Sequence, residues 1–305
     1  MVVRIRTHRP NEPNQPGDER GSKTFLLGAG AQKAGTTWLY RYLQASPQFA
    51  HGYRKEYHVF DSRDLPSEAW MRDRILKLAE DSVAAARRGE PADAEVLHRA
   101  SMYADPAFYF DYFAGLLRRS PDIRLAADLT PGYALLSVER LRELRSGFED
   151  RRVRPVAIML LRDPVDRIWS QVRMQHQRQP EKFEVSAEET LQQRYADPQY
   201  ARRNDYHRTI EALDASFGPG GQVHYAFYER LFERSEVEAI CDFVGIDVHT
   251  ADFAKRHNES TGSPDSLAEG TIRAVATHYR EVYAAVAERF PQVDLGAVWP
   301  NSRLL

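Results

Sequence analysis

The sequence has very few of the residues that disulfides and metal clusters require. Cys241 is the only cysteine among 305 residues, which excludes a disulfide within the chain and any metal site built from several thiolates. This cysteine lies in EAICDFVGI, a stretch with an apolar stripe. We expect a core thiol, because free cysteine packs as a small apolar side chain.

Long apolar runs and a large net charge are also missing. No stretch contains the roughly 20 apolar residues that span a bilayer, and the N-terminus lacks the apolar segment and cleavage site of a secretory signal. The formal net charge is only −2, so the overall composition does not indicate binding to nucleic acid or to a membrane. We therefore expect a cytoplasmic protein with no nucleic-acid partner and no stable membrane insertion.

Residues 1–22 are rich in Pro, Asn, Gly and charge, which is typical of a disordered lead-in. Ordered structure is expected from Lys23 onward. Residues 23–305 contain no internal repeat and no linker-like stretch, and 42% of the whole chain is hydrophobic, so one domain with a sizeable core is predicted.

Apolar runs alternate with amphipathic stretches along this domain. We predict strands at 24–30, 123–129, 154–163 and 220–229. Helices are predicted at 36–46, 66–89, 105–120, 137–148, 164–176, 186–196, 202–217, 230–245 and 267–290. The alternation predicts an α/β fold: a single P-loop-type domain with a mostly parallel central sheet flanked by helices.

The stretch GAGAQKAGTTWLYRYL, at 28–43, joins the first predicted strand to the first predicted helix. Backbone N–H groups at a helix N-terminus have no intrahelical partners, and the helix dipole favours negative charge there. Gly35 permits close backbone approach, Thr36 and Thr37 add hydroxyl donors, and Lys33 adds a positive charge. These features predict a site for a phosphate-like anion.

This loop differs from the loop that binds nucleoside triphosphates, which ends Gly-Lys-Ser/Thr. Here Thr36 follows Gly35 directly, and Lys33 comes two residues earlier. The strand at 154–163 ends Leu-Arg-Asp, so Arg162, with Ser170 eight residues later, suits a second anionic group. An atypical P-loop kinase or NTPase and a non-catalytic nucleotide-binding protein are the alternatives to the function considered next.

Taken together, these motifs resemble those of the sulfotransferases that use 3′-phosphoadenosine 5′-phosphosulfate (PAPS). QKAGTTWL at 32–39 resembles the family's 5′-phosphosulfate loop, and LLRDPVDRIWSQ at 160–171 resembles its 3′-phosphate motif. KEYHVFDS at 55–62 and DLTPGYALL at 128–136 resemble segments of the glycosaminoglycan branch and its bacterial relatives. The resemblance extends in family order from about Lys23 to Gly262.

The resemblance implies in-line transfer of the sulfuryl group from PAPS to a hydroxyl or amine, with 3′,5′-ADP (PAP) as product and no metal. Lys33 is then the residue that neutralises charge on the leaving group. The residues implied in donor binding are Lys33, Ala34, Gly35, Thr36 and Thr37 at the 5′-group, Trp38 near the adenine, and Arg162 and Ser170 at the 3′-phosphate.

The resemblance also implies that Glu56 is the base that accepts the proton of the acceptor, with His58 as helper or alternative base. Where the glycosaminoglycan branch has a lysine before Thr-Pro, this chain has Leu129, preceded by Asp128. We therefore expect a small-molecule or carrier-tethered hydroxylated acceptor in place of a polyanionic sugar. The stretch HNESTGSP at 257–264 is expected to form a loop over the nucleotide.

Overall fold

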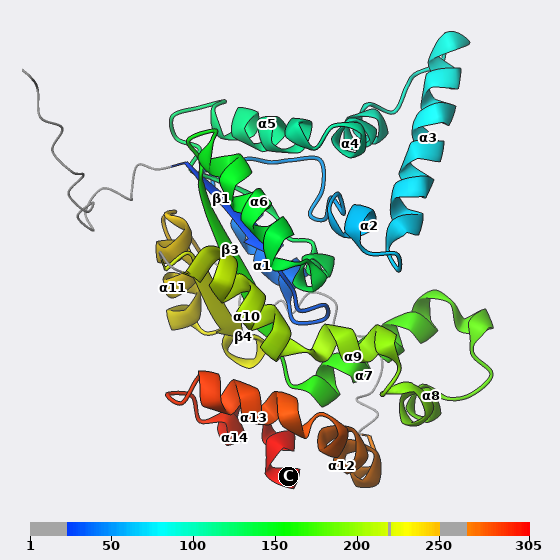
Figure 1. Ribbon diagram of the computed structural model, residues 1–305, viewed down its shortest axis with the longest axis vertical. Coiled ribbons are helices and arrows are strands. Elements are labelled where there is room, and N and C mark those ends of the chain that lie inside the picture. The colour runs from blue at the N-terminus through cyan, green and yellow to red at the C-terminus, as the bar shows by residue number, and fades with distance from the viewer. Residues whose placement is uncertain (1–22, 219–220, 251–266) are drawn as a thin grey trace, which may run out of the picture.

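Four parallel strands form the centre of the molecule (Figure 1). The computed structural model describes residues 23–218, 221–250 and 267–305. The strands are Thr24–Gly28 (β1), Leu125–Asp128 (β2), Arg154–Leu161 (β3) and Val223–Phe227 (β4). Their order is β2-β1-β3-β4, and every neighbouring pair is parallel, which confirms the predicted α/β fold. The predicted lead-in at 1–22 and the predicted loop at 257–264 lie outside the described residues.

Helices surround this sheet. The α-helices are Thr36–Gln44 (α1), Asp61–Asp64 (α2), Ala69–Arg87 (α3), Ala94–Ala104 (α4), Pro106–Leu117 (α5), Val138–Glu149 (α6), Pro164–Arg178 (α7), Ala187–Arg194 (α8), Pro198–Asn204 (α9), Tyr206–Phe217 (α10), Arg234–Val244 (α11), Glu269–His278 (α12), Arg280–Arg289 (α13) and Leu295–Val298 (α14). Short 3₁₀ helices cover Pro131–Leu135 (η2), Pro180–Lys182 (η3), Tyr228–Arg230 (η5) and Pro300–Leu304 (η6). Within the described ranges, no helix is both long and apolar enough to cross a membrane.

The strand order places helices on both faces of the sheet. The chain moves from β1 to β2 in one direction and from β2 to β3 in the other. Because crossovers between parallel strands are right-handed, α1 and α6 lie on opposite faces. Helices α6 and α10 pack together over β3 and lie in front of the sheet in Figure 1.

Aromatic residues fill the core under α5 and α6. Phe25 of β1 stacks on Phe148 of α6, with ring centroids 3.8 Å apart, and meets Phe113 of α5 edge-on at 4.8 Å. On the other side, Tyr42 of α1 contacts Cys241 of α11, with the hydroxyl 3.4 Å from the sulfur. Cys241 is fully buried, so its predicted place in the core is confirmed.

Several predicted helix boundaries were wrong for local reasons. The single helix predicted at 267–290 is two helices, α12 and α13, which are separated at Tyr279. The helix predicted at 202–217 begins at Tyr206, because the side chain of Asp205 accepts a hydrogen bond from Arg208 N and caps α10. The helix predicted at 230–245 begins at Arg234, after the 3₁₀ turn η5. Helix α4, capped by Asp93, was not predicted.

A buried carboxylate ties the end of β2 to the chain segment at 55–58. Asp128 is fully buried and accepts hydrogen bonds from Tyr109 OH at 2.9 Å, Tyr133 OH at 3.0 Å and Thr130 Oγ1 at 2.5 Å. Tyr57 N also faces it, at 3.3 Å. Burial raises the pKa of Asp128 to about 6, although these donors stabilise the ionised form. The carboxylate therefore holds the 55–58 segment against the carboxyl end of the sheet.

Replacing Asp128 with Ala should destabilise the protein by about 3 kcal/mol or more, because several buried donors lose their shared acceptor. Tyr109→Phe is the matched control: it removes one donor and should cost only about 1 kcal/mol. Urea unfolding followed by circular dichroism measures both. Equal losses in the two variants would contradict the anchoring role of the carboxylate.

Candidate active site

The candidate site lies where the chain leaves β1 and β3. These strands are neighbours, but the chain leaves β1 toward β2 and leaves β3 toward β4. The connections diverge at this switch point, and ligands of open α/β sheets bind in the crevice that this creates. The two connections meet there, because Arg162 Nη1 donates a hydrogen bond to the carbonyl oxygen of Lys33 at 2.7 Å.

Gly35 ends the loop after β1 and has a left-handed backbone, with φ 87°. A Cβ atom there would lie 2.7 Å from Leu231 Cδ2 and 2.9 Å from Tyr228 Cδ2, so a larger residue would strain the loop and collide with its neighbours. No side chain caps the N-terminus of α1. Its positive end therefore faces the crevice and suits an anion.

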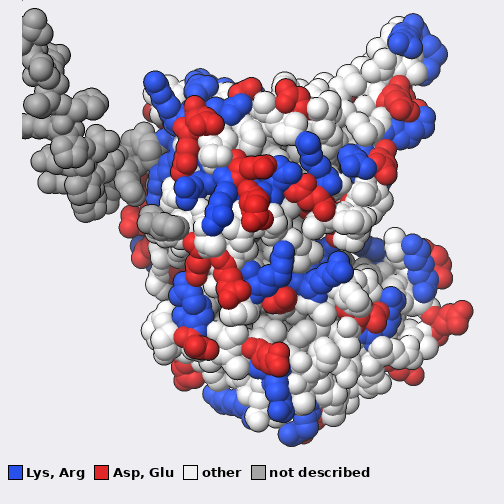
Figure 2. Space-filling model, in the orientation of Figure 1, with Lys and Arg blue, Asp and Glu red and all other residues white. Residues whose placement is uncertain are grey.

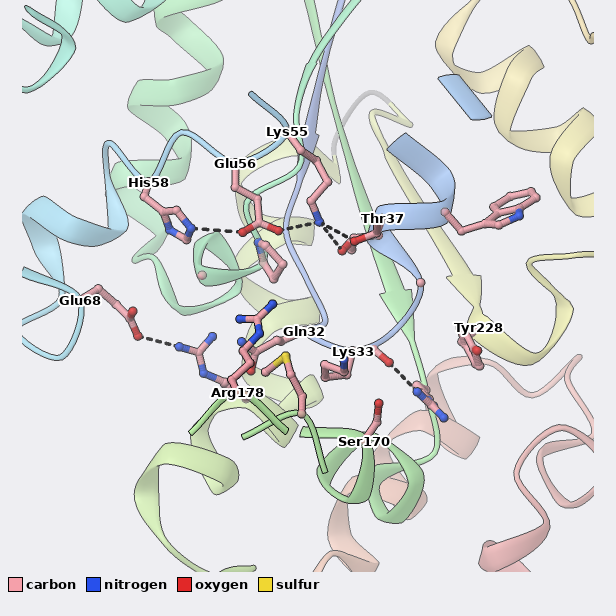
Figure 3. A pocket seen from close by; sticks show the side chains of 18 of the residues that line it. Gln32, Lys33, Thr37, Lys55, Glu56, His58, Glu68, Ser170, Arg178 and Tyr228 are labelled. Atoms are coloured by element: carbon pink, nitrogen blue, oxygen red, sulfur yellow. Dashed lines mark hydrogen bonds and ion pairs between the residues drawn. The ribbon is translucent and has the colours of Figure 1, made fainter. Parts of the chain in front are cut away.

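A cavity of about 390 Å³ opens at this point. Its lining includes the predicted residues Lys33, Gly35, Thr36, Thr37, Trp38, Glu56, His58, Arg162 and Ser170. Of the predicted site residues only Ala34 is absent from the lining, because its side chain is fully buried. Figure 3 shows that the labelled side chains converge on this cavity from the loop after β1, the 55–58 segment and α7. The structure thus brings together residues that are far apart in the sequence.

Arg162 is positioned by contacts that leave its charge free. Its guanidinium lies 4.3 Å from the ring centroid of Tyr228, and its own carbonyl oxygen accepts a hydrogen bond from Tyr206 OH at 2.8 Å. Its Nε is buried without a hydrogen-bond partner, and it forms no ion pair with any carboxylate of the described residues. A fixed guanidinium with unused donors fits a phosphate-like anion.

Helix α7 contributes a row of side chains to the cavity. Its start is set by Pro164 and by Asp163, whose side chain accepts a hydrogen bond from Val165 N at 2.9 Å. Ser170, Met174 and Arg178 follow at intervals of four residues on one face and line the cavity. The sequence interpretation missed Arg178, although this spacing from Ser170 could have indicated it.

Lys33 lies among several cations. Burial, followed by the positive charges of Arg162, Arg178, Arg173 and Lys55, lowers its pKa to about 8. Its backbone is left-handed, with φ 69°, which is uncommon for a residue with a side chain. A cluster of cations of this kind is stabilised when an anion binds between its members.

A chain of ionic contacts crosses the cavity on the side of the 55–58 segment (Figure 3). Lys55 Nζ donates to Thr36 Oγ1 at 3.2 Å and to Thr37 Oγ1 at 3.1 Å, and it lies 2.5 Å from Glu56 Oε1. The other Glu56 oxygen lies 3.3 Å from His58 Nε2. Lys55 was not among the predicted site residues, although it directly precedes Glu56 in the KEYHVFDS segment.

A second carboxylate pairs with the other nitrogen of the His58 ring. His58 Nδ1 lies 2.7 Å from Asp61 Oδ2, and Asp61 is fully buried. A Cβ atom on Gly132 would lie 2.1 Å from the same Asp61 oxygen, so glycine is required at position 132. His58 itself has a left-handed backbone, with φ 56°, and Figure 3 shows its ring pointing toward Glu56. Strained backbones of this kind concentrate at functional sites.

These contacts shift the titration of both groups. Burial alone would lower the pKa of His58, but its hydrogen bonds to Asp61 and Glu56 outweigh this effect and raise the pKa to about 9. Burial would raise the pKa of Glu56, but the His58 hydrogen bond and the charge of Lys55 lower it to about 2. At neutral pH the pair is an imidazolium and a carboxylate, and an imidazolium has no lone pair to accept a proton.

Two other predicted features look different in the structure. Trp38 is mostly buried and stacks on Tyr42, so only part of it reaches the cavity, and its place near adenine stays a prediction. Leu129 and Asp128 are both buried and do not line this cavity. Position 129 therefore does not contribute to the charge of this cavity, and the expected small-molecule or carrier-tethered hydroxylated acceptor stays a prediction.

The fold and the cavity define an α/β protein with a cavity at the switch point of its sheet, lined by the N-terminus of α1 and by Lys33, Arg162 and Arg178. Residues 26–250 match the profile of the sulfotransferase family, and this chain belongs to that family. The match is to the family as a whole and does not single out the glycosaminoglycan branch. No curated protein sequence matches the chain significantly.

One solved structure of low sequence identity has a similar fold, and two further sulfotransferase structures match less well. A sulfotransferase from Alicyclobacillus acidocaldarius is 17% identical, with 88% of this chain and 95% of that chain covered and a TM-score of 0.57. The sulfotransferase domain from the curacin biosynthetic pathway is 15% identical, with 85% and 97% covered and a TM-score of 0.42. The sulfotransferase domain of the Synechococcus PCC 7002 olefin synthase is 18% identical, with 88% and 98% covered and a TM-score of 0.42.

The contacts of His58 predict an unusual titration. A ¹H–¹⁵N NMR titration of the His58 ring should give a pKa of about 9, and Asp61→Asn should return it toward 6.5. Because the pKa in the folded protein exceeds the ordinary value, the contribution to stability is complete below pH 6.5 and is lost as the pH rises through about 9. A midpoint near 6.5 in the unmodified protein would contradict the two hydrogen bonds from the His58 ring to Asp61 and Glu56.

Proposed function

We propose that this protein transfers the sulfuryl group of PAPS to a hydroxyl group of an acceptor. The observation that supports this most directly is the junction of two anion sites in one cavity, joined by the bond from Arg162 to Lys33 O. One site is the loop and α1 N-terminus, and the other is Arg162 with Ser170. PAPS has a 5′-phosphosulfate and a separate 3′-phosphate, so its two anionic groups match this pair of sites.

In this proposal the 5′-phosphosulfate occupies the α1 N-terminus, where Thr36 and Thr37 add hydroxyl donors. Lys33 lines the same cavity, Lys55 donates hydrogen bonds to both threonines, and the two lysines neutralise the charge that develops on the leaving oxygen. The bond between sulfur and the bridging oxygen breaks as the acceptor oxygen forms a new bond to sulfur. Arg162 and Ser170 hold the 3′-phosphate and thereby fix the donor in line with the acceptor.

Glu56 receives the proton of the acceptor. It is ionised at neutral pH, whereas His58 has both ring nitrogens engaged with carboxylates and serves to position Glu56. A base with a low pKa is sufficient here, because a hydroxyl oxygen becomes strongly acidic as it bonds to sulfur. The alternative base, His58, would first need to lose its proton and one ionic contact.

The two other functions that the sequence left open have less support. A P-loop kinase or NTPase would have a lysine directly after the second glycine of the loop, whereas Thr36 follows Gly35. The family match also supports a sulfotransferase over that alternative. A non-catalytic nucleotide-binding protein would not require the ordered contacts from Lys55 through Glu56 to His58 and Asp61.

Donor recognition should depend on the 3′-phosphate. Arg162→Ala should weaken binding of 3′,5′-ADP by about 30-fold, the scale of a lost charged hydrogen bond, and binding of 5′-AMP by less than about threefold. Isothermal titration calorimetry with the two nucleotides measures this. Arg162→Lys is the matched control, since it retains the charge without the planar fork and should recover part of the affinity. An equal loss of affinity for both nucleotides would show that Arg162 does not bind the 3′-phosphate.

A change at Glu56 should impair sulfuryl transfer without impairing donor binding. Glu56→Gln keeps the shape of the side chain but removes its basicity, so transfer of ³⁵S from PAPS to hydroxylated probe acceptors should fall roughly 10²-fold. Affinity for 3′,5′-ADP should stay within about threefold, because a glutamine of the same size can still accept a hydrogen bond from Lys55, which contacts Thr36 and Thr37. His58→Gln is the comparison: a larger loss of transfer there than at Glu56 would make the histidine the base.

A further inference from the structure

A second cavity, of about 480 Å³, adjoins the first on the side away from the loop. The two cavities share Lys55, Glu56, His58, Trp70 and Met71 in their linings. The volume is in the usual range for small-molecule sites. Because the shared wall contains the proposed base, this cavity is where an acceptor would present its hydroxyl, an inference that rests on the proposed function.

One wall of this cavity is apolar, and part of it is open to solvent. It consists of Trp70, Ile75 and Leu78 of α3 with Val96 of α4, and the side chains of Trp70 and Leu78 are 57% and 40% exposed. Helix α3 projects from the body of the molecule in Figures 1 and 2. Of the eight exposed large hydrophobic residues among those described, four lie on α3: Trp70, Leu76, Leu78 and Val83. An apolar surface beside a polar catalytic group is typical of a binding site.

The lining of this cavity also contains a buried cation without a counter-ion. Arg99 of α4 is only 6% exposed, and its Nη2 donates to Tyr57 O at 3.2 Å and to Tyr103 OH at 3.5 Å. Its Nε is buried without a hydrogen-bond partner, and Arg99 forms no ion pair with any carboxylate in the described part of the chain. A buried charge is costly unless it is paired.

The neighbouring arginines increase this excess of positive charge. Arg54 forms an ion pair with Glu95, and its pKa is lowered, first by burial and then by the charge of Arg99. Arg74 is exposed and has no carboxylate partner among the described residues. Glu56 is the only carboxylate in the lining, and Lys55 already balances it. Arg74 and Arg99 thus remain without carboxylate partners, and only Arg99 is buried, so the cavity complements a ligand with an anionic group at Arg99.

We propose that the acceptor is an amphiphile: a hydroxylated molecule with an apolar body and one anionic group, either a carboxylate or a phosphate. The apolar body packs against Trp70, Ile75 and Leu78, and the anionic group pairs with Arg99 at the buried end. The hydroxyl then lies at Glu56, on the wall shared with the donor cavity. The apolar wall disfavours a polyanionic sugar, and the unpaired Arg99 disfavours an entirely neutral acceptor.

The full-length protein, saturated with 3′,5′-ADP, can be titrated by calorimetry with two probes of equal chain length, 10-hydroxydecanoate and 1,10-decanediol. The hydroxy acid should bind about tenfold more tightly or better, the scale of a charged hydrogen bond. Arg99→Gln should reduce this preference to less than about threefold, and Arg99→Lys should restore part of it. Arg72→Gln is the matched control, because Arg72 lies on α3 outside the cavity and pairs with Asp73.

Two leucine variants of α3, one inside and one outside the cavity, test the apolar wall. Leu78→Gln should weaken both probes by about fivefold, whereas Leu76→Gln, at a similarly exposed position of the same helix outside the cavity, should leave both unchanged. Equal affinity for the two probes in the unmodified protein would overturn the proposal that the acceptor has an anionic group, and this outcome needs no Arg99 variant. Equal effects of the two leucine variants would overturn the proposal that an apolar body packs against α3.

The design separates this inference from the proposed function. Affinity for 3′,5′-ADP is measured in the same preparations. A protein that prefers the hydroxy acid but does not bind 3′,5′-ADP would refute the proposed donor and still support the amphiphile site. A protein that binds 3′,5′-ADP but neither probe would overturn the amphiphile site and leave the donor proposal in place.

Discussion

Parallel pairing of β1 with both β2 and β3 is the constraint on which the site depends. Parallel strands bring their carboxyl ends to one edge of a sheet, so the segments that follow them must share that edge. The loop with Lys33 follows β1, Arg162 follows β3, and the buried Asp128 ends β2. Asp128 in turn holds the 55–58 segment in place. Lys33, Arg162 and the 55–58 segment are therefore positioned by the same ladder of backbone hydrogen bonds.

The charges of the cavity are separated into two sides. On the donor side, burial first and then repulsion from Arg162 and Arg178 lower the pKa of Lys33. A bound anion would relieve this repulsion, in keeping with the proposed donor. On the other side, Glu56 contacts His58 and Lys55. The His58 hydrogen bond and the charge of Lys55 keep the Glu56 carboxylate ionised.

The sequence predicted the strands and most helices well, because their signals are local. The apolar run of β3, the glycine-rich turn after β1 and the proline at the start of α7 each act within a few residues. The errors arose where local signals were weak. The break at Tyr279 has no proline or glycine, and the amphipathic pattern continues across it, so one long helix was predicted. Helix α4 was missed although Asp93 caps it.

For the site, the sequence by itself determined the chemical groups: an anion-binding loop with Lys33, a strand-end arginine at 162 and an acidic residue at 56. These groups could be identified because each lies in a short motif of fixed spacing. Only the tertiary structure decided their partners. The bond from Lys55 to Thr36 and Thr37 and the unpaired state of Arg99 depend on segments that approach through folding. The pKa of each group also depends on its burial, which the whole fold decides and the local sequence does not encode.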